Sequence, residues 1–212
     1  MNEPSFPANR RWPVYILAGG RSARFGGDKA LAEVAGQPLL SRIADSARPF
    51  AESVTVVADR ADKYENLGLA TIADATPHLG PLGGLLAALR HCEDQSGKRW
   101  IVLLSCDLVA VRQAWIERLA ATIMGGAPGA AFFDGRWQPF PGLYHTSLSP
   151  LVERRLASGD ASMQPLLSAA GCHLADPPAD WPDVASINTH DDLARLTATP
   201  DTGAPPPSGA GG

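Results

Sequence analysis

Short apolar runs alternate along the chain with longer segments in which apolar residues recur every three or four positions. The short runs are rich in β-branched residues and predict strands, and they span residues 14–17, 53–57, 69–72 and 100–104. The longer segments predict helices, and they span residues 38–48, 81–92 and 112–124. Because strands and helices alternate, we expect an α/β fold with three layers, a doubly wound and mostly parallel sheet between helices.

The pattern changes in the second half of the chain. Residues 130–133 and 137–144 predict short strands or a ribbon, because two prolines interrupt the second run. Residues 145–157 and 161–170 then show helical spacing. We expect this half to complete the sheet.

The length and the composition of the two ends predict a single domain. A chain of 212 residues can bury one substantial core. Residues 197–212 consist almost wholly of Thr, Pro, Gly, Ala and Ser, a composition that cannot bury enough apolar surface to offset the entropy lost on ordering. We therefore expect disordered ends at residues 1–12 and 197–212 and one domain at residues 13–196.

Charge and cysteine content narrow the class of protein. The net charge of −4 gives no general basic field to attract nucleic acid. The three cysteines are widely spaced, which argues for reduced thiols rather than disulfides or a metal site. Residues 1–11 are polar and contain no apolar core of the length that a signal peptide needs, and no later run reaches the length of a membrane span. We expect a cytoplasmic protein with no nucleic-acid or membrane partner.

A glycine-rich stretch, residues 17–29, follows the first predicted strand and carries Arg21, Arg24 and Lys29. Glycine lets the backbone approach an anion closely, so that successive N–H groups can point at it. Arginine offers a planar fork to two phosphate oxygens, whereas lysine offers a compact charge. The stretch therefore predicts a polyphosphate site.

Two common phosphate loops do not fit this stretch. A P-loop places a hydroxyl residue directly after its lysine, but Ala30 follows Lys29. The dinucleotide fingerprint separates its first two glycines by one residue, but Gly19 and Gly20 are adjacent. The predicted polyphosphate site is therefore of another kind.

Carboxylates follow two of the predicted strands. Asp107 fits either a magnesium ligand or the N-cap of a helix that begins near Val109. Asp74 fits either a nucleotide contact or an ordinary turn, since Thr76 and Pro77 follow it. Because ligands of such sheets bind where strands end, we expect these residues to meet the glycine-rich stretch at one edge.

The pattern from Leu17 to Leu31, Leu-Ala-Gly-Gly-x-Ser-x-Arg-Phe-Gly-x-Asp-Lys-Ala-Leu, resembles the signature of the molybdenum cofactor guanylyltransferase family of the nucleotidyltransferase superfamily. The likeness extends over residues 14–196. Its strongest further segments are residues 70–74, 80–85, 101–107 and 187–193.

This resemblance implies a Rossmann-like nucleotidyltransferase fold and transfer of GMP from GTP to the phosphate of molybdenum-bound molybdopterin, with release of pyrophosphate. It also implies a need for Mg²⁺ and transient contact with molybdoenzymes or proteins that insert the cofactor. By the same resemblance, Arg24, Lys29 and Asp107 are catalytic and Asp107 binds the metal. The implied nucleotide-binding residues are Leu17, Ala18, Gly19, Gly20, Lys29, Asp74 and Asp107.

Three positions depart from the family pattern. Ala58 and Ser186 stand where the family often has asparagine, and no proline follows shortly after Asp107. These departures keep open a nucleotide-binding homologue with weakened catalysis.

A related nucleotidyltransferase that uses CTP, or that acts on a sugar phosphate, is a second alternative. The adjacent Gly19 and Gly20 favour the guanylyl branch, because cytidylyl relatives more often have Leu-Ala-Ala-Gly here. The pair Asp28-Lys29 favours the same branch.

Overall fold

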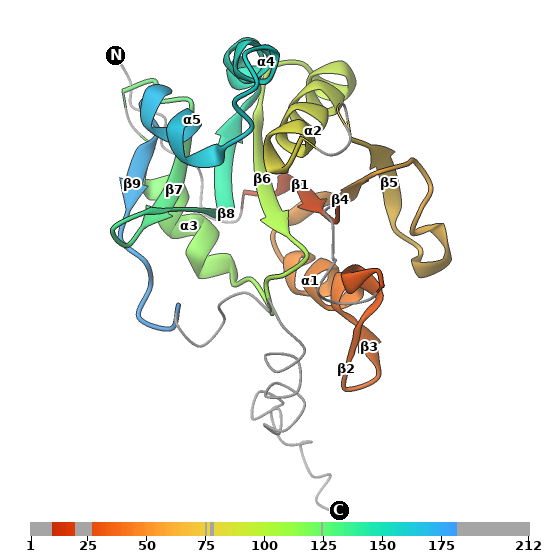
Figure 1. The fold of residues 1–212 in the computed structure, drawn as a ribbon. Helices are drawn as coiled ribbons and strands as arrows, with labels where there is room; N and C mark the ends of the chain where they lie inside the picture. Colours follow the sequence, from red (N-terminus) through yellow and green to blue (C-terminus); the bar gives the residue numbers. More distant parts are fainter. Residues whose placement is uncertain (1–9, 20–26, 75, 77–78, 124, 182–212) are drawn as a thin grey trace, which may run out of the picture.

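The computed structural model describes residues 10–19, 27–74, 76, 79–123 and 125–181. Its centre is a seven-stranded sheet with the order β5-β4-β1-β6-β8-β7-β9 (Figure 1). β8 runs antiparallel to both of its neighbours, and the other pairs are parallel. The strands are β1 (Trp12–Leu17), β4 (Ala51–Ala58), β5 (Ala70–Ala73), β6 (Trp100–Ser105), β7 (Gly129–Phe133), β8 (Trp137–His145) and β9 (His173–Ala175).

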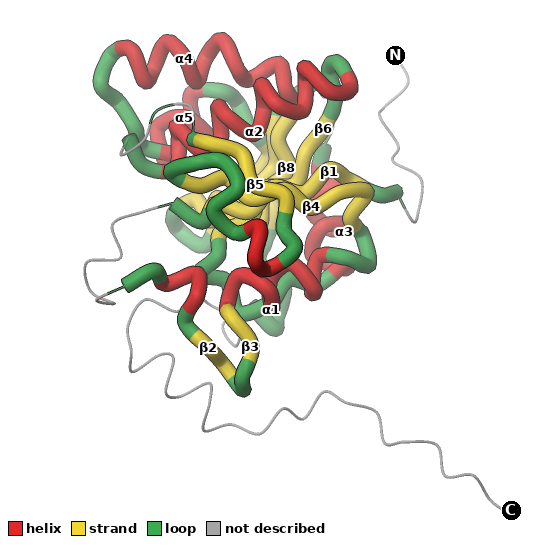
Figure 2. Tube along the Cα trace, turned by 90° about the vertical axis from the view of Figure 1, so that its right-hand side faces the viewer, coloured by secondary structure: helices red, strands yellow, loops and turns green. Residues whose placement is uncertain are grey.

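Helices cover both faces of this sheet, as Figure 2 shows. One layer contains α1 (Leu39–Ala47) and α3 (Gln113–Thr122), and the other contains α2 (Pro81–Ser96), α4 (Ser149–Ala157) and α5 (Met163–Ala169). Alternate residues of β1 supply the two cores, since Val14 and Ile16 pack with the first layer and Tyr15 and Leu17 with the second. The three-layer, mostly parallel α/β arrangement predicted from the sequence is confirmed.

Short elements complete the chain. The 3₁₀ helices are η1 (Lys29–Leu31), η2 (Glu65–Leu67) and η3 (Thr146–Leu148), and a small hairpin joins β2 (Glu33–Val34) to β3 (Gln37–Pro38). Two differences from the predicted elements concern boundaries. β1 already begins at the buried Trp12, and the first turn of the helix predicted after residue 145 is the 3₁₀ helix η3.

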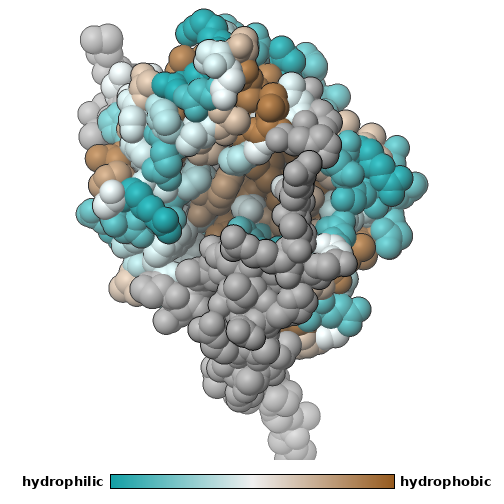
Figure 3. All heavy atoms as spheres, in the orientation of Figure 1, coloured by the Kyte–Doolittle hydropathy of each residue, from teal (hydrophilic) through white to brown (hydrophobic). Residues whose placement is uncertain are grey.

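Hydrophilic side chains cover the margins of the face drawn in Figure 3, and hydrophobic side chains gather nearer its centre. Within the described ranges, no helix combines the length and the apolar composition that a membrane crossing needs.

Candidate functional site

The end of β1 is tied to the ends of both neighbouring strands. The Ala18 N–H donates to the carbonyl oxygen of Val57 at 2.9 Å, and the Cys106 N–H donates to the carbonyl oxygen of Leu17 at 3.0 Å. These bonds continue the parallel ladders by one residue beyond the strands. They bring the glycine-rich stretch and the segment that leads to Asp107 to one edge of the sheet, as the sequence predicts.

Leu17 and Ala18 are buried at this edge, whereas Gly19 is exposed. A Cβ atom on Gly19 would have no other atom within 4 Å, so packing within the described structure does not require glycine there. Gly20 and Arg24, and with them Arg21, lie outside the described residues.

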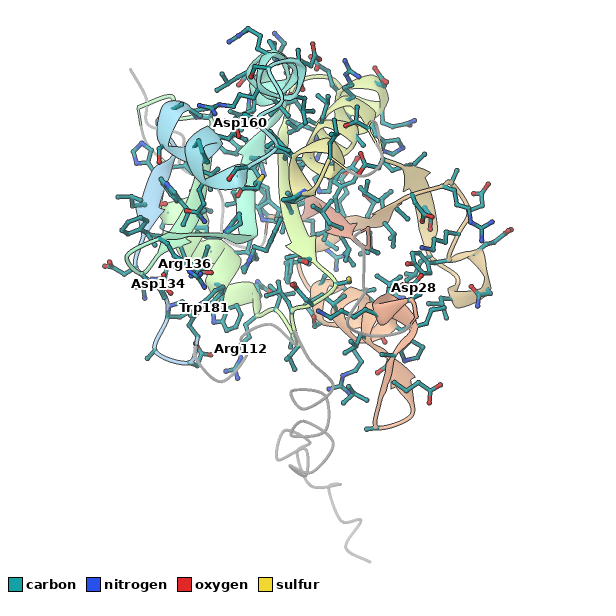
Figure 4. All side chains as sticks on the ribbon, viewed as in Figure 1. Asp28, Arg112, Asp134, Arg136, Asp160 and Trp181 are labelled. Carbon is teal, nitrogen blue, oxygen red and sulfur yellow. The ribbon has the colours of Figure 1, made fainter. Side chains whose placement is uncertain are left out.

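Asp28 organises the segment in which the glycine-rich stretch ends. Its Oδ1 accepts a hydrogen bond from the Ala30 N–H at 3.1 Å and thereby caps η1, whose first residue is Lys29. Its Oδ2 accepts from the Tyr64 hydroxyl at 2.8 Å and from Lys63 Nζ at 3.0 Å. Sequence reasoning missed Tyr64 and Lys63, because they lie between two strands in a stretch without a recognisable motif. Figure 4 shows Asp28 beside the 3₁₀ helix and α1.

Asp107 lies in a turn after β6, which the Leu108 N–H closes by donating to the carbonyl oxygen of Ser105 at 3.2 Å. The next helix, α3, begins only at Gln113 and has Arg112 as its N-cap. The alternative of Asp107 as a helix cap is therefore wrong. The Asp107 carboxylate is half-buried at the carboxyl edge.

The charges of Asp107 and Lys29 both affect the pKa of the Cys106 thiol. Burial, and then the Asp107 carboxylate, raise the pKa of the Cys106 thiol to about 12, while the positive charge of Lys29 opposes this rise. The thiol is thus protonated at neutral pH, which fits a packing role rather than that of a nucleophile. Geometry ties the start of η1 to the same strand end, because the Tyr64 hydroxyl reaches both Asp28 and the carbonyl oxygen of Ala18.

Asp107 fits a magnesium ligand by its chemistry and position. Magnesium is commonly held by one or two carboxylates together with water and substrate phosphates. Among the described residues, no group of three or more His, Cys, Asp and Glu side chains could form a metal site made by the protein alone. A metal at Asp107 would therefore depend on phosphate oxygens for much of its coordination.

Asp74 forms the turn that is one of its two predicted roles, and the nucleotide contact stays a prediction. Its own N–H donates to the carbonyl oxygen of Ala58 at 2.6 Å, and its Oδ1 accepts from the Thr76 N–H at 2.9 Å, so it forms a turn after β5. A Cβ atom on Gly83 would lie 2.7 Å from both Asp74 Oδ1 and Thr76 Oγ1. The carboxylate therefore also lies against the first turn of α2, at the predicted site.

The first turn of α2 carries the amino end of the helix dipole to the same edge. Its N-cap, Gly80, has φ of 71° and makes no side-chain capping bond. Gly84 lies against Leu17, the last residue of β1. The edge thus carries the first turn of α2 and the Asp107 carboxylate, and Lys29 begins η1. These groups are of the kinds that suit phosphate together with a divalent cation.

The opposite part of this edge is built by the second half of the chain. Figure 4 shows Arg112, Asp134, Arg136 and Trp181 there, across the molecule from Asp28. Arg112 pairs with Asp180 at 2.8 Å, and the Trp181 ring packs on Phe132 of β7. His145 lies at the other edge, where its ring contacts Trp100 at the start of β6. His78, Ser186 and Asn188 lie outside the described residues.

Comparisons with known proteins identify the family of the chain. The family model described as the MobA-like NTP transferase domain matches residues 14–174. The chain is 34% identical over 189 residues to the molybdenum cofactor guanylyltransferase of Serratia proteamaculans, covering 85% of this chain and 91% of that protein. It is 30% identical over 198 residues to the protein of the same name from Photobacterium profundum, covering 91% and 99%.

Solved structures share the fold. A crystal structure of a protein from Aquifex aeolicus VF5 has a TM-score of 0.70 at 25% identity, covering 84% of this chain and 94% of that one. The structure of molybdopterin-guanine dinucleotide biosynthesis protein A from Archaeoglobus fulgidus has a TM-score of 0.69 at 22% identity, covering 87% and 96%. The second likeness concerns the fold alone.

Proposed function

Because the chain belongs to the MobA-like NTP transferase domain family, we propose that it transfers GMP from GTP to the phosphate of molybdenum-bound molybdopterin and releases pyrophosphate. Relatives named molybdenum cofactor guanylyltransferase, matched over most of their length, support the proposal. The observation that carries it is the hydrogen bond from the Cys106 N–H to Leu17, which brings the start of the glycine-rich stretch and the segment that leads to Asp107 together at the carboxyl edge of the sheet.

The reaction needs positioning more than a nucleophilic side chain. An acceptor phosphate is already ionised at neutral pH, so one of its oxygens can attack the α-phosphorus directly. A new P–O bond forms, the bond from the α-phosphorus to the bridging oxygen breaks, and pyrophosphate leaves with that electron pair. The protein must align the two anions and offset their charge.

The chain's own residues supply this alignment in the proposal. Gly19, Gly20 and Arg24 grip the triphosphate, and Lys29 offers a compact charge that can follow the leaving pyrophosphate. Leu17, Ala18 and Asp74 complete the nucleotide contacts. Asp107 would hold Mg²⁺, which when bound offsets the charge of the donor and acceptor phosphates.

The departures noted in the sequence bear on the alternative of weakened catalysis. Ala58 is fully buried, and its carbonyl oxygen accepts the hydrogen bond from the Asp74 N–H. The backbone at this position thus orders a proposed nucleotide contact without an asparagine side chain. Turnover with the acceptor distinguishes an active enzyme from a homologue that only binds nucleotide.

A binding experiment followed by a turnover experiment tests the proposal. Thermal unfolding is measured with each of four nucleoside triphosphates and Mg²⁺, and GTP is expected to stabilise the protein most. Pyrophosphate release is then measured with GTP and molybdenum-bound molybdopterin together. Stabilisation by CTP alone would move the assignment to the cytidylyl branch, and GTP binding without pyrophosphate release would support an inactive homologue.

We further propose that residues 13–196 carry the activity and that the enzyme works in the cytoplasm on small molecules, without nucleic acid or membrane. Its product would pass on through transient contact with molybdoenzymes or proteins that insert the cofactor. Deletion of residues 197–212 should leave the melting temperature and the turnover unchanged, because their composition offers little apolar surface to bury. A large loss in either quantity would show that this segment takes part.

A further inference from the structure

We propose that Tyr64 and Lys63 are positioning residues, which act through Asp28 to hold Lys29 where the phosphates of the donor bind. The inference rests on the proposed function, in which Lys29 contacts those phosphates. It adds two residues from outside the glycine-rich stretch to the machinery of the reaction.

Tyr64 joins the two described ends of the glycine-rich stretch. Its hydroxyl donates to Asp28 Oδ2 at 2.8 Å and also lies 3.3 Å from the carbonyl oxygen of Ala18. Ala18 lies near the beginning of the glycine-rich stretch and Asp28 near its end, so one side chain contacts both parts. Tyr64 is 1% exposed, so its ring has little freedom to move.

The chemistry of the Tyr64 hydroxyl suits this role. Burial, followed by the hydrogen bond to Asp28, raises the pKa of Tyr64, so the hydroxyl stays protonated and donates at every physiological pH. Hydrogen bonds to a charged acceptor are stronger than those between neutral groups. The Tyr64–Asp28 contact is therefore a firm anchor rather than an incidental contact.

Asp28 transmits the anchoring to Lys29. One carboxylate oxygen receives Tyr64, and the other accepts from the Ala30 N–H. The side chain of the residue before Lys29 is thus bonded to the backbone of the residue after it, which fixes the backbone on both sides of the lysine. A displacement of Asp28 would move the origin of the Lys29 side chain, and such small misplacements are costly in catalysis.

Lys63 contributes charge as well as position. Its Nζ lies 3.0 Å from Asp28 Oδ2 and 2.8 Å from Asp59 Oδ1. Burial opposes the protonated form, but the hydrogen bonds to Asp59 and Asp28 dominate and raise the pKa of Lys63, so the amine remains charged. Without Lys63, the negative charge of Asp28 would stand beside the proposed phosphate site without this counter-charge and would repel the donor.

The test compares two buried tyrosines, of which Tyr64 packs in the core of the first helix layer and Tyr15 in that of the second. Tyr64→Phe removes the hydroxyl that reaches Asp28, and Tyr15→Phe removes one that is hydrogen-bonded to His91 Nδ1 at 2.8 Å. Tyr15 is 3% exposed and is therefore a matched control for the loss of a buried hydroxyl. We expect kcat to fall about tenfold in Tyr64→Phe and to remain unchanged in Tyr15→Phe. Equal kcat values in the two variants would overturn the proposal.

Coupling to Lys29 separates positioning from a general structural effect. If Tyr64 acts through Lys29, the loss of kcat caused by Tyr64→Phe should disappear in a Lys29→Ala background. Additive losses would contradict the proposal.

For Lys63→Met, calorimetry without acceptor should show GTP binding weakened by about tenfold at low salt and by less at high salt. Unchanged affinity at both salt concentrations would remove Lys63 from the positioning unit.

The outcome for this inference is distinct from that for the proposed function. Nucleotide preference and turnover are properties of the wild-type protein, whereas the positioning role appears only in differences between variants. If the wild-type protein prefers CTP, the same comparisons are made with CTP. The proposed function then fails while the roles of Tyr64 and Lys63 are still decided.

Discussion

Leu17 lies so close to Gly84 that a methyl group added to the glycine would stand 2.8 Å from Leu17 Cδ2. Leu17 ends β1, and Gly84 belongs to the first turns of α2, so this contact sets the distance between the strand end and the helix. Two segments of the candidate site are thus held together by packing, and glycine is needed at this point for close approach rather than for an unusual φ.

Gly84→Ala should therefore disturb both stability and nucleotide binding. Overpacking of a well-packed core costs about 1–3 kcal/mol, and the displaced Leu17 is a proposed nucleotide contact. Thermal unfolding with and without GTP measures both effects. Gly27→Ala is the control for stability, because a Cβ atom there has no neighbour within 4 Å among the described residues. Equal melting temperatures for the two variants would contradict the packing argument.

Much of the fold could be predicted because its parallel strands are buried on both faces. Such strands appear as continuous apolar runs, and the ends of β1 and β6 coincide with the glycine-rich stretch and Asp107. Because the carboxyl ends of parallel strands share one edge of a sheet, the sequence alone predicted that these two segments lie close together. The hydrogen bond from the Cys106 N–H to Leu17 confirms that placement.

Other features could not be predicted because their signals are weak or not local. β9 has only three residues, and the hairpin of β2 and β3 has two on each strand, which is too short for a pattern. Tyr64 is another case, because its partner Asp28 is 36 residues away in the sequence. A single buried tyrosine resembles any core aromatic until the structure shows what its hydroxyl meets.

Lys29→Ala tests the lysine that η1 presents at the site. We expect kcat to fall by about a hundredfold with the melting temperature unchanged, because the interaction strengthens as charge develops on the leaving pyrophosphate. Lys98→Ala is the control, since Lys98 is exposed and precedes β6 at the opposite edge of the sheet. A Lys29→Ala variant with the kcat of the wild-type protein would remove this residue from the mechanism.

His145 lies away from the candidate site, and its protonation makes the free energy of unfolding depend on pH. Its Nδ1 accepts a hydrogen bond from the Ser147 N–H at 3.2 Å, and burial, followed by the charge of Lys98, lowers the pKa of His145. The folded state thus binds its proton less readily than the unfolded chain. The stability contribution is complete above the unfolded pKa of about 6.5 and is lost as the pH falls from there through the folded pKa.

A substitution at His145 isolates this effect. Asparagine in His145→Asn can still accept the Ser147 N–H but does not titrate. Urea unfolding between about pH 7.5 and 5 should show a smaller decrease in the free energy of unfolding for the variant than for the wild-type protein. Equal decreases would mean that other groups cause the pH dependence.

Asp107 provides the sharpest test of the proposed chemistry, because the structure excludes the alternative that this residue is the N-cap of a helix. The residue stands in a turn, and the following helix α3 starts at Gln113. Placing a carboxylate at the end of an apolar strand costs free energy unless the carboxylate pairs with a positive charge or binds a metal ion. Asp107→Asn keeps the size of the side chain and removes only that charge.

We expect Asp107→Asn to fold like the wild-type protein, to turn over at least about a hundredfold more slowly, and to need a higher Mg²⁺ concentration for half-maximal rate. The reason is that the metal would lose its anionic anchor while the phosphates still bind it weakly. Asp94→Asn, an exposed carboxylate of α2, should change neither quantity. Pyrophosphate release measured across a Mg²⁺ titration decides the matter: wild-type turnover by Asp107→Asn at limiting Mg²⁺ would exclude the metal assignment and, with it, the proposed use of this edge of the sheet.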